Sequence, residues 1–111
     1  MLFRSQVSSV TGSLESGIEF LLNTGALQYA VQVPVLGSFN ADNAALALAV
    51  CAQIGVDYGS SVQALASFPG VPGRMERVEI PTCHAVVDYA HSPDAVDRVL
   101  RVLDEIGRAH V

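Results

Sequence analysis

The sequence predicts an α/β fold in which antiparallel strands and two helices are followed by a strand–strand–helix unit. Three observations support this prediction. Short β-type runs separated by turn residues fill the chain up to Val35. A strongly apolar stretch of helical length follows at Ala41–Ile54. Beyond a Pro/Gly corner at Val71–Gly73, two more β-type runs lead into a further helical pattern.

The first strands are predicted at Phe3–Val10, Gly17–Leu22 and Tyr29–Val35, where the chain is apolar or alternates over strand-like lengths. Turn residues at Thr11–Ser13 and Asn23–Gly25 separate these runs. Short turns join antiparallel neighbours, so the three runs predict an antiparallel meander.

The first helix is predicted over Ala44–Ile54, with Asn40 or Asp42 as its cap. Apolar residues occur nearly all round this helix, so we expect it to be buried on most faces. Gly55 is expected to end it in a left-handed conformation.

A second, shorter helix is predicted to begin at Ser60 or Ser61, either of which can cap it, and to run to about Ser67. The Phe68-Pro69-Gly70 sequence then stops the helix. The corner that follows, Val71–Gly73, is the best predicted domain boundary.

After the corner, strands are predicted at Val78–Ile80 and Ala85–Val87, joined by a turn at Pro81-Thr82. A helix is then predicted from Pro93 to about Leu103. Ser92 suits its N-cap and Pro93 its first helical position. The expected apolar stripe of this helix consists of Val96, Val99, Leu100 and Leu103.

The last seven residues, Glu105–Val111, need a separate interpretation. They back-translate to GAG ATC GGA AGA GCA CAC GTC, which resembles the start of a common sequencing-adapter oligonucleotide. We interpret 105–111 as adapter read-through, with the protein continuing past Asp104, and therefore give His110 no role. The alternative is a natural helix end with Gly107 as its cap.

Composition indicates a globular protein, because half of the 111 residues are apolar and 15% are charged. The net charge of −5 argues against a nucleic-acid partner, which would require a clustered basic surface. Cys51 and Cys83 lie in apolar settings at wide spacing, which predicts reduced thiols in a cytoplasmic protein; a disulfide between them is the alternative.

No membrane partner is expected. Polar residues interrupt the apolar core that a signal peptide would need in Met1–Val10. Ala41–Ile54 is apolar but shorter than the roughly 20 residues that span a bilayer. Cys83 and His84 are adjacent on a predicted strand, so their side chains point to opposite faces and cannot share a metal ion.

Candidate ligand-binding residues lie in the run Asp88-Tyr89-Ala90-His91-Ser92-Pro93, between a predicted strand and a predicted helix. Open α/β sheets place ligand-contacting groups at this point, beyond the carboxyl end of a strand. Asp88 offers two acceptor oxygens there, and His91 lies in the following turn. The alternative role for His91 is a hydrogen bond that stabilises the turn.

Two earlier blocks carry an asparagine and an arginine. In Gly37–Ala44, Asn43 presents a carboxamide that can donate and accept at once against a purine edge. Helix capping by the asparagines is the alternative. In Gly73–Glu76, the planar fork of Arg74 suits bidentate binding of phosphate or ribose oxygens, and a solvated surface position is the alternative.

Together the three blocks resemble, in order and spacing, the motifs of the Mur ligases, and most closely those of the MurE branch. Gly37–Ala44 is similar to the family element Gly-x-(Phe/His)-Asn-x-x-Asn, and Asp88–Pro93 is similar to Asp-Tyr-Ala-His-Thr-Pro. The resemblance is good from Leu36 to Asp104 and looser before it. One departure is Ser38, where many MurE ligases have a basic residue.

The resemblance implies a role in ATP binding for four residues. Asn43 is expected near the adenine and ribose, and Asp88 on the ribose hydroxyls. Arg74 is expected to reach the nucleotide from a hinge, and His91 to face it. The resemblance assigns no catalytic and no metal-ligating residue to this chain.

The resemblance also implies a domain division. Residues 1–73 correspond to the C-terminal part of a central ATP-binding domain with antiparallel strands and helices. Residues 74–104 correspond to the first β-β-α elements of a Rossmann-like C-terminal ligase domain. The chain has no lysine, and so lacks the phosphate-loop motif Gly-x-x-x-x-Gly-Lys-Ser/Thr. ATP and Mg²⁺ are therefore expected to bind mainly to parts of the parent enzyme outside this chain, and the chain alone is expected to be inactive.

The implied activity is ATP-dependent addition of the third amino acid to UDP-N-acetylmuramoyl-L-alanyl-D-glutamate in peptidoglycan synthesis, through an acyl phosphate. The implied partners are this nucleotide-linked dipeptide, an amino acid (meso-diaminopimelate or lysine) and ATP, and the parent enzyme is expected to be monomeric. One alternative is a related ligase similar to cyanophycin synthetase or folylpolyglutamate synthetase. Another is a non-catalytic interaction module.

Overall fold

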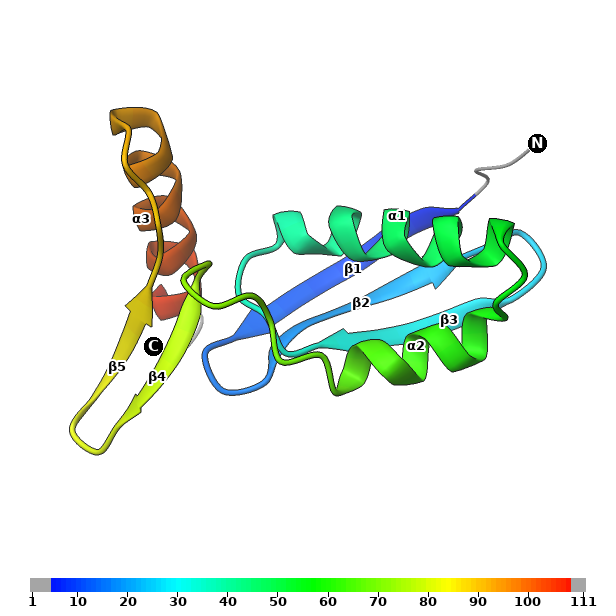
Figure 1. The fold of residues 1–111 in the computed structure, drawn as a ribbon, viewed down its shortest axis with the longest axis horizontal. Helices are drawn as coiled ribbons and strands as arrows, with labels where there is room; N and C mark the ends of the chain where they lie inside the picture. The colour runs from blue at the N-terminus through cyan, green and yellow to red at the C-terminus, as the bar shows by residue number, and fades with distance from the viewer. Residues whose placement is uncertain (1–4, 109–111) are drawn as a thin grey trace.

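The computed structural model describes residues 5–108 and has the α/β architecture that the sequence predicts. Two antiparallel sheets are present, a three-stranded one of order β1-β2-β3 and a two-stranded one of β4 and β5 (Figure 1). The elements in chain order are β1 (Gln6–Ser13), β2 (Gly17–Asn23), β3 (Gln28–Val33), α1 (Phe39–Gln53), α2 (Tyr58–Ala66), β4 (Glu76–Ile80), β5 (Cys83–Val87) and α3 (Pro93–Arg108).

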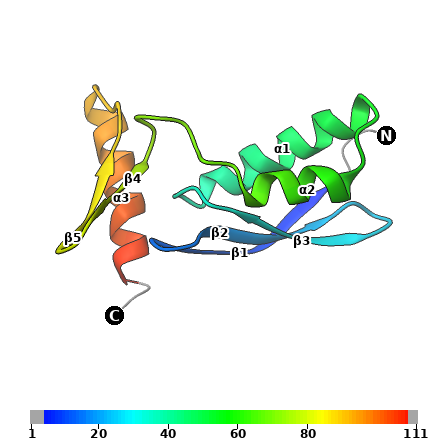
Figure 2. The same ribbon diagram turned by 60° about the horizontal axis from the view of Figure 1, so that its bottom comes forward.

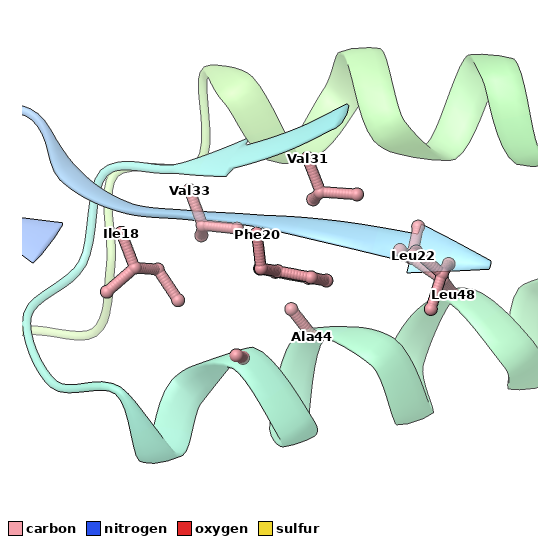
Figure 3. Packing of buried hydrophobic residues seen from close by; sticks show 8 residues of the cluster. Ile18, Phe20, Leu22, Val31, Val33, Ala44 and Leu48 are labelled. Carbon is pink, nitrogen blue, oxygen red and sulfur yellow. The ribbon is translucent and has the colours of Figure 1, made fainter. Parts of the chain in front are cut away.

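The main core lies between the three-stranded sheet and α1. Alternate residues of a strand face the same side of a sheet, and the alternation in β2 turns Ile18, Phe20 and Leu22 inward, where each is at most 2% exposed. Figure 3 shows these side chains meeting Ala44 and Leu48 of α1. Both α1 and α2 lie on this one face of the sheet (Figure 2), so this part of the chain forms two layers.

The outer side of α1 is exposed, and the expectation that this helix is buried on most faces was therefore wrong. Leu46, Val50 and Ile54 are 60%, 51% and 75% exposed, because no other described element covers that side. The expected cap was also wrong, because the helix begins at Phe39 and its N-cap residue, Ser38, makes no side-chain cap bond. Gly55 takes the expected left-handed conformation, with φ of +95°.

The second helix, α2, begins two residues before the predicted serines. Its N-cap is Asp57, whose carboxylate accepts hydrogen bonds from the Ser60 N–H and the Ser60 hydroxyl, each at 2.9 Å. The prediction of Ser60 or Ser61 as the cap was therefore wrong, since both lie inside the first turn. The hydrogen bonds from Ser60 lower the pKa of Asp57 below its ordinary value.

The second sheet is the predicted hairpin, with Ile80 paired to Cys83 across the turn. Ser92 caps α3 as predicted, because its hydroxyl oxygen accepts from the Ala95 N–H at 3.2 Å. The expected apolar stripe of α3 was partly wrong. Val99 and Leu103 are half-buried, but Val96 and Leu100 are 42% and 59% exposed, while Val102 and Ile106 are the buried positions.

The C-terminal end of α3 enters the segment interpreted as adapter read-through. The helix continues to Arg108, so Gly107 lies within it and does not cap it. The interpretation of 105–111 stays a prediction, and His110 lies outside the described residues.

A second apolar cluster connects the end of the three-stranded sheet with the hairpin and α3. Leu36, which follows β3, is buried with Met75, Val102 and Ile106. Beside this cluster, the Arg77 guanidinium donates to the backbone carbonyls of Leu14 and Glu15 in the β1–β2 turn. The hairpin and α3 are thus fixed against the first sheet through this packing and the two hydrogen bonds from Arg77. The domain boundary at 73/74 stays a prediction.

Both cysteines are free thiols, as expected. Within residues 5–108, no helix has the length and apolar character needed to cross a bilayer.

Candidate functional site

The three sequence blocks meet around one cleft of about 600 Å³. All four predicted ligand-binding residues line it, although they come from separate places along the chain: the start of α1, the corner before β4, the end of β5 and the turn before α3. The complete lining is Phe39, Asn40, Asn43, Arg74, Met75, Asp88, Tyr89, Ala90, His91, Ala95, Arg98 and Val99.

Two consecutive side-chain hydrogen bonds orient Asn43 on α1. The Asn40 side-chain amide donates to the Leu36 carbonyl at 2.8 Å, and the Asn43 amide donates to Asn40 Oδ1 at 3.1 Å. Neither asparagine caps the helix, so the capping alternative does not apply. One amide hydrogen and the carbonyl oxygen of Asn43 are left to donate and accept at the cleft.

Asp88 links the end of β5 to the corner that carries Arg74. Its Oδ1 accepts a hydrogen bond from the Met75 N–H at 2.8 Å. Met75 has a φ of +47°, which is uncommon for a residue with a side chain, and this bond helps to hold that conformation. Among the described residues, Asp88 Oδ2 has no hydrogen-bond partner, so one acceptor oxygen stays available to a ligand.

A second carboxylate steadies the corner from the other side. Glu76 Oε1 accepts from the Gly73 N–H at 2.9 Å, where Gly73 has a left-handed φ of +76°. Arg74 is therefore held between two backbone positions that are each tied to a carboxylate. Such support fixes the backbone of this candidate binding residue and leaves its side chain free to reorient.

Aromatic rings extend the site beside Arg74. The guanidinium carbon of Arg74 lies 5.6 Å from the centre of the Tyr89 ring, within the range of a cation–π contact. The Tyr89 ring in turn lies 5.0 Å from the His91 ring, at an angle of 54°. His91 Nδ1 is 3.0 Å from the Tyr89 carbonyl oxygen, which supports the turn-stabilising role and leaves Nε2 to face a ligand.

Sequence reasoning assigned no binding role to the other residues of this lining, among them the large side chains of Phe39, Tyr89 and Arg98. A signal for Arg98 was present, because Ala95, Arg98 and Val99 recur at the spacing that places residues on one side of the predicted helix. Tyr89 belongs to a block that was recognised, but no role was assigned to its ring.

Other chemistry has little support in the described chain. Residues 5–108 contain no group of three or more His, Cys, Asp or Glu side chains that could hold a metal ion. Cys83 and His84 lie exposed at the tip of the β4–β5 hairpin, away from the cleft. The pKa of Arg101 is raised by its hydrogen bond to Asp97, at 2.8 Å, and this ion pair also lies outside the cleft lining.

No family model matches the chain. The similar proteins of known name, however, are all ligases of one kind among those reported below. The chain is 42% identical over 102 residues to the UDP-N-acetylmuramoyl-L-alanyl-D-glutamate–2,6-diaminopimelate ligase of Streptomyces coelicolor. It is 43% identical over 81 residues to the ligase of the same name from Streptomyces avermitilis. These matches cover 89% and 70% of this chain, but only 20% and 16% of the relatives.

Solved structures give the same result. A structure of a UDP-N-acetylmuramoyl-L-alanyl-D-glutamate–2,6-diaminopimelate ligase superposes with a TM-score of 0.74 at 36% identity, over 90% of this chain and 20% of that one. MurF from Acinetobacter baumannii superposes with a TM-score of 0.79 over 91% of this chain and 22% of that one, and its 24% identity supports the fold alone. The chain thus belongs to the Mur ligase family, is similar in sequence to its MurE members, and spans about one fifth of their length.

Proposed function

We propose that this chain is part of an enzyme that adds the third amino acid to UDP-N-acetylmuramoyl-L-alanyl-D-glutamate, and that its cleft binds the adenosine end of ATP. The observation that carries the proposal is the convergence of Asn43, Arg74, Asp88 and His91 on one cleft from separate sequence blocks. The names of the relatives at 42% and 43% identity support the reaction class.

The lining residues fit a nucleoside with a charged tail. Asp88 Oδ2 is available as an acceptor for ribose hydroxyls, while Oδ1 is already bonded to Met75. Asn43 presents both a donor and an acceptor, as recognition of a purine edge requires. Arg74 supplies a planar fork that matches phosphate oxygens.

The described residues do not form a binding site for Mg²⁺. The ion prefers several oxygen ligands in near-octahedral geometry, and residues 5–108 bring no group of three acidic or histidine side chains together. We assign Mg²⁺ to parts of the enzyme outside this chain. The same holds for the phosphate loop, since this chain contains no lysine.

In the proposed reaction, ATP phosphorylates the D-glutamyl carboxylate, the amine of the incoming amino acid attacks the acyl phosphate, and phosphate leaves. The residues of this chain do not take part in bond making. Their role is to hold and orient the nucleotide, since a fixed geometry removes much of the entropic part of the barrier. Asn43 lies before the predicted boundary at 73/74, Arg74 at it and Asp88 after it, so binding of one nucleotide by all three is coupled to closure of the C-terminal domain.

We infer a cytoplasmic, monomeric parent enzyme with meso-diaminopimelate as its amino acid. The relatives named above are 2,6-diaminopimelate ligases, which favours this substrate over lysine.

The test is an assay of the full-length enzyme that contains this segment. Phosphate release should require ATP, Mg²⁺, UDP-N-acetylmuramoyl-L-alanyl-D-glutamate and an amino acid, with meso-diaminopimelate preferred to lysine. Omission of the amino acid is the control. An enzyme that releases phosphate with glutamate or aspartate polymers in place of the muramoyl dipeptide would instead be a related ligase. An enzyme that shows no ATP turnover at all would contradict the proposal.

A further inference from the structure

We infer that Arg98 is a second phosphate-binding cation of the cleft, acting beside Arg74. This inference rests on the proposed nucleotide site and adds a residue that the sequence blocks do not contain. Arg98 lies on α3 and lines the same cleft as Arg74, Asp88 and His91.

The first argument comes from the partners of the arginines whose side chains the structure describes. Arg77 donates to the backbone carbonyls of Leu14 and Glu15, and Arg101 pairs with Asp97. Within that part of the chain, Arg74 and Arg98 have neither a carboxylate nor a carbonyl partner. These two unpaired guanidiniums line one cleft, so the cleft gathers cations that the fold does not neutralise.

The second argument is that Arg98 has a suitable partner within its own helix and does not use it. Asp94 lies four residues earlier on α3, and an acidic residue at that position relative to an arginine favours an ion pair. The equivalent pair does form one turn later, between Asp97 and Arg101 at 2.8 Å. Arg98 instead lines the cleft, on the same side of α3 as Ala95 and Val99.

The third argument is the charge of the lining. Two guanidiniums and the single Asp88 carboxylate leave one net positive charge around the cleft, in a chain whose net charge is −5. In the proposed site, Asn43 binds the purine edge and Asp88 the ribose hydroxyls, and neither contact requires a positive charge. The remaining positive charge therefore matches the phosphates, and a guanidinium binds phosphate oxygens in a fixed, bidentate geometry.

The test compares Arg98→Gln with Arg101→Gln in the full-length enzyme. Both substitutions remove one positive charge from an exposed position of α3, but only Arg98 lines the cleft. Binding of ATP, ADP and adenosine is measured by calorimetry, with melting temperatures as a check on folding. Arg98→Lys, which keeps the charge but not the fork, is the second variant at the same position.

We expect Arg98→Gln to weaken ATP and ADP by about tenfold, the loss typical of one charge-assisted hydrogen bond, and to leave adenosine unchanged. Arg98→Lys should recover part of the loss, and Arg101→Gln should change none of the three affinities. If Arg98→Gln behaves like Arg101→Gln, Arg98 has no role, while the proposed nucleotide site stands. An equal loss for adenosine would overturn the phosphate assignment. A wild-type enzyme that binds none of the three ligands would overturn the proposed function and this inference together.

Discussion

The Asp88 carboxylate accepts a hydrogen bond from the Met75 N–H at 2.8 Å, joining the end of β5 to the corner before β4. One oxygen of this carboxylate thus supports the backbone next to Arg74, and the other is available to the ribose of a bound nucleotide. Asp88 thus has a structural role on one oxygen, and the ribose-binding role that we propose for it falls on the other.

This division predicts different outcomes for two substitutions at position 88 in the full-length enzyme. Asp88→Asn keeps an acceptor for the Met75 N–H but removes the charge and the second acceptor. ATP should bind about ten- to a hundredfold more weakly, from the loss of about 1–3 kcal/mol, with little change in melting temperature. Asp88→Ala removes both oxygens, so it should weaken ATP and also lower the melting temperature. An Asp88→Asn enzyme with an unchanged Michaelis constant for ATP and a lowered melting temperature would show that the carboxylate is only structural.

A second prediction concerns the cap of α2. Asp57 has a lowered pKa because its ionised form accepts hydrogen bonds from Ser60. A carboxyl group whose pKa is lower in the folded state stabilises the fold above its unfolded pKa, and this stabilisation is lost as the pH falls through the folded pKa. Asp57→Ala should therefore lower the melting temperature at pH 7 and reduce its sensitivity to acid. Asp57→Asn, which keeps the acceptor oxygen, should lose less at pH 7. Thermal unfolding between pH 3 and 7 measures both effects, and an identical pH dependence in all three proteins would contradict them.

Local patterns in the sequence were sufficient for much of the fold. The positions of the strand runs, the Pro81-Thr82 turn and the Ser92 cap follow from residues that lie next to one another, and the structure confirms them. The turn predicted at Thr11–Ser13 was wrong, because these residues extend β1 and pair with β2, and the turn follows at 14–16. The order of the three blocks also identified four residues that line one cleft, although their binding roles stay predictions.

The errors arose where the outcome depends on elements distant in sequence. Composition cannot tell which side of α1 meets the sheet, so the exposure of Leu46 and Ile54 was not foreseen. On α3, contact with Leu36 and Met75 selects Val102 as a buried position and leaves Leu100 exposed. The cap of α2 failed for a local reason, because Asp57 competes with the nearby serines and can accept two hydrogen bonds at once.

The exposed side of α1 predicts the behaviour of the isolated chain. Leu46, Val50 and Ile54 recur every four residues and form an apolar stripe along the helix. Contiguous exposed apolar surface promotes association, so the isolated chain should self-associate in dilute solution. Replacing the three residues with glutamine should reduce the association measured by light scattering. The control replaces three exposed polar residues, Gln53, Gln63 and Ser67, with alanine and should change the association little. A monomeric wild-type chain with a cooperative thermal transition would contradict this prediction.

Gly17 and Gly25 provide a matched pair for testing the sheet. Both have a left-handed φ, of 82° and 92°. A Cβ at Gly17 would lie 2.4 Å from the Val33 carbonyl oxygen, whereas a Cβ at Gly25 would have nothing within 4 Å. Gly25→Ala should therefore cost only the backbone strain, about 1–2 kcal/mol, and Gly17→Ala should cost clearly more because β2 and β3 must separate. Melting temperatures of the two variants of the full-length enzyme test this, and equal values would exclude the clash.

The last prediction tests whether Arg74 and Asp88 bind the same ligand. Arg74→Lys keeps the charge but loses the planar fork, so it should weaken ATP by about tenfold. Neighbouring residues that share one ligand are not independent, and the double variant Arg74→Lys/Asp88→Asn should therefore weaken ATP by less than the product of the single effects. Arg101→Lys, outside the cleft, is the control and should combine with Asp88→Asn without coupling. Binding constants for ATP from calorimetry complete the cycle. If the effects of Arg74→Lys and Asp88→Asn are strictly multiplicative, the two side chains act independently. The proposal that Arg74 and Asp88 bind one nucleotide together would then be wrong.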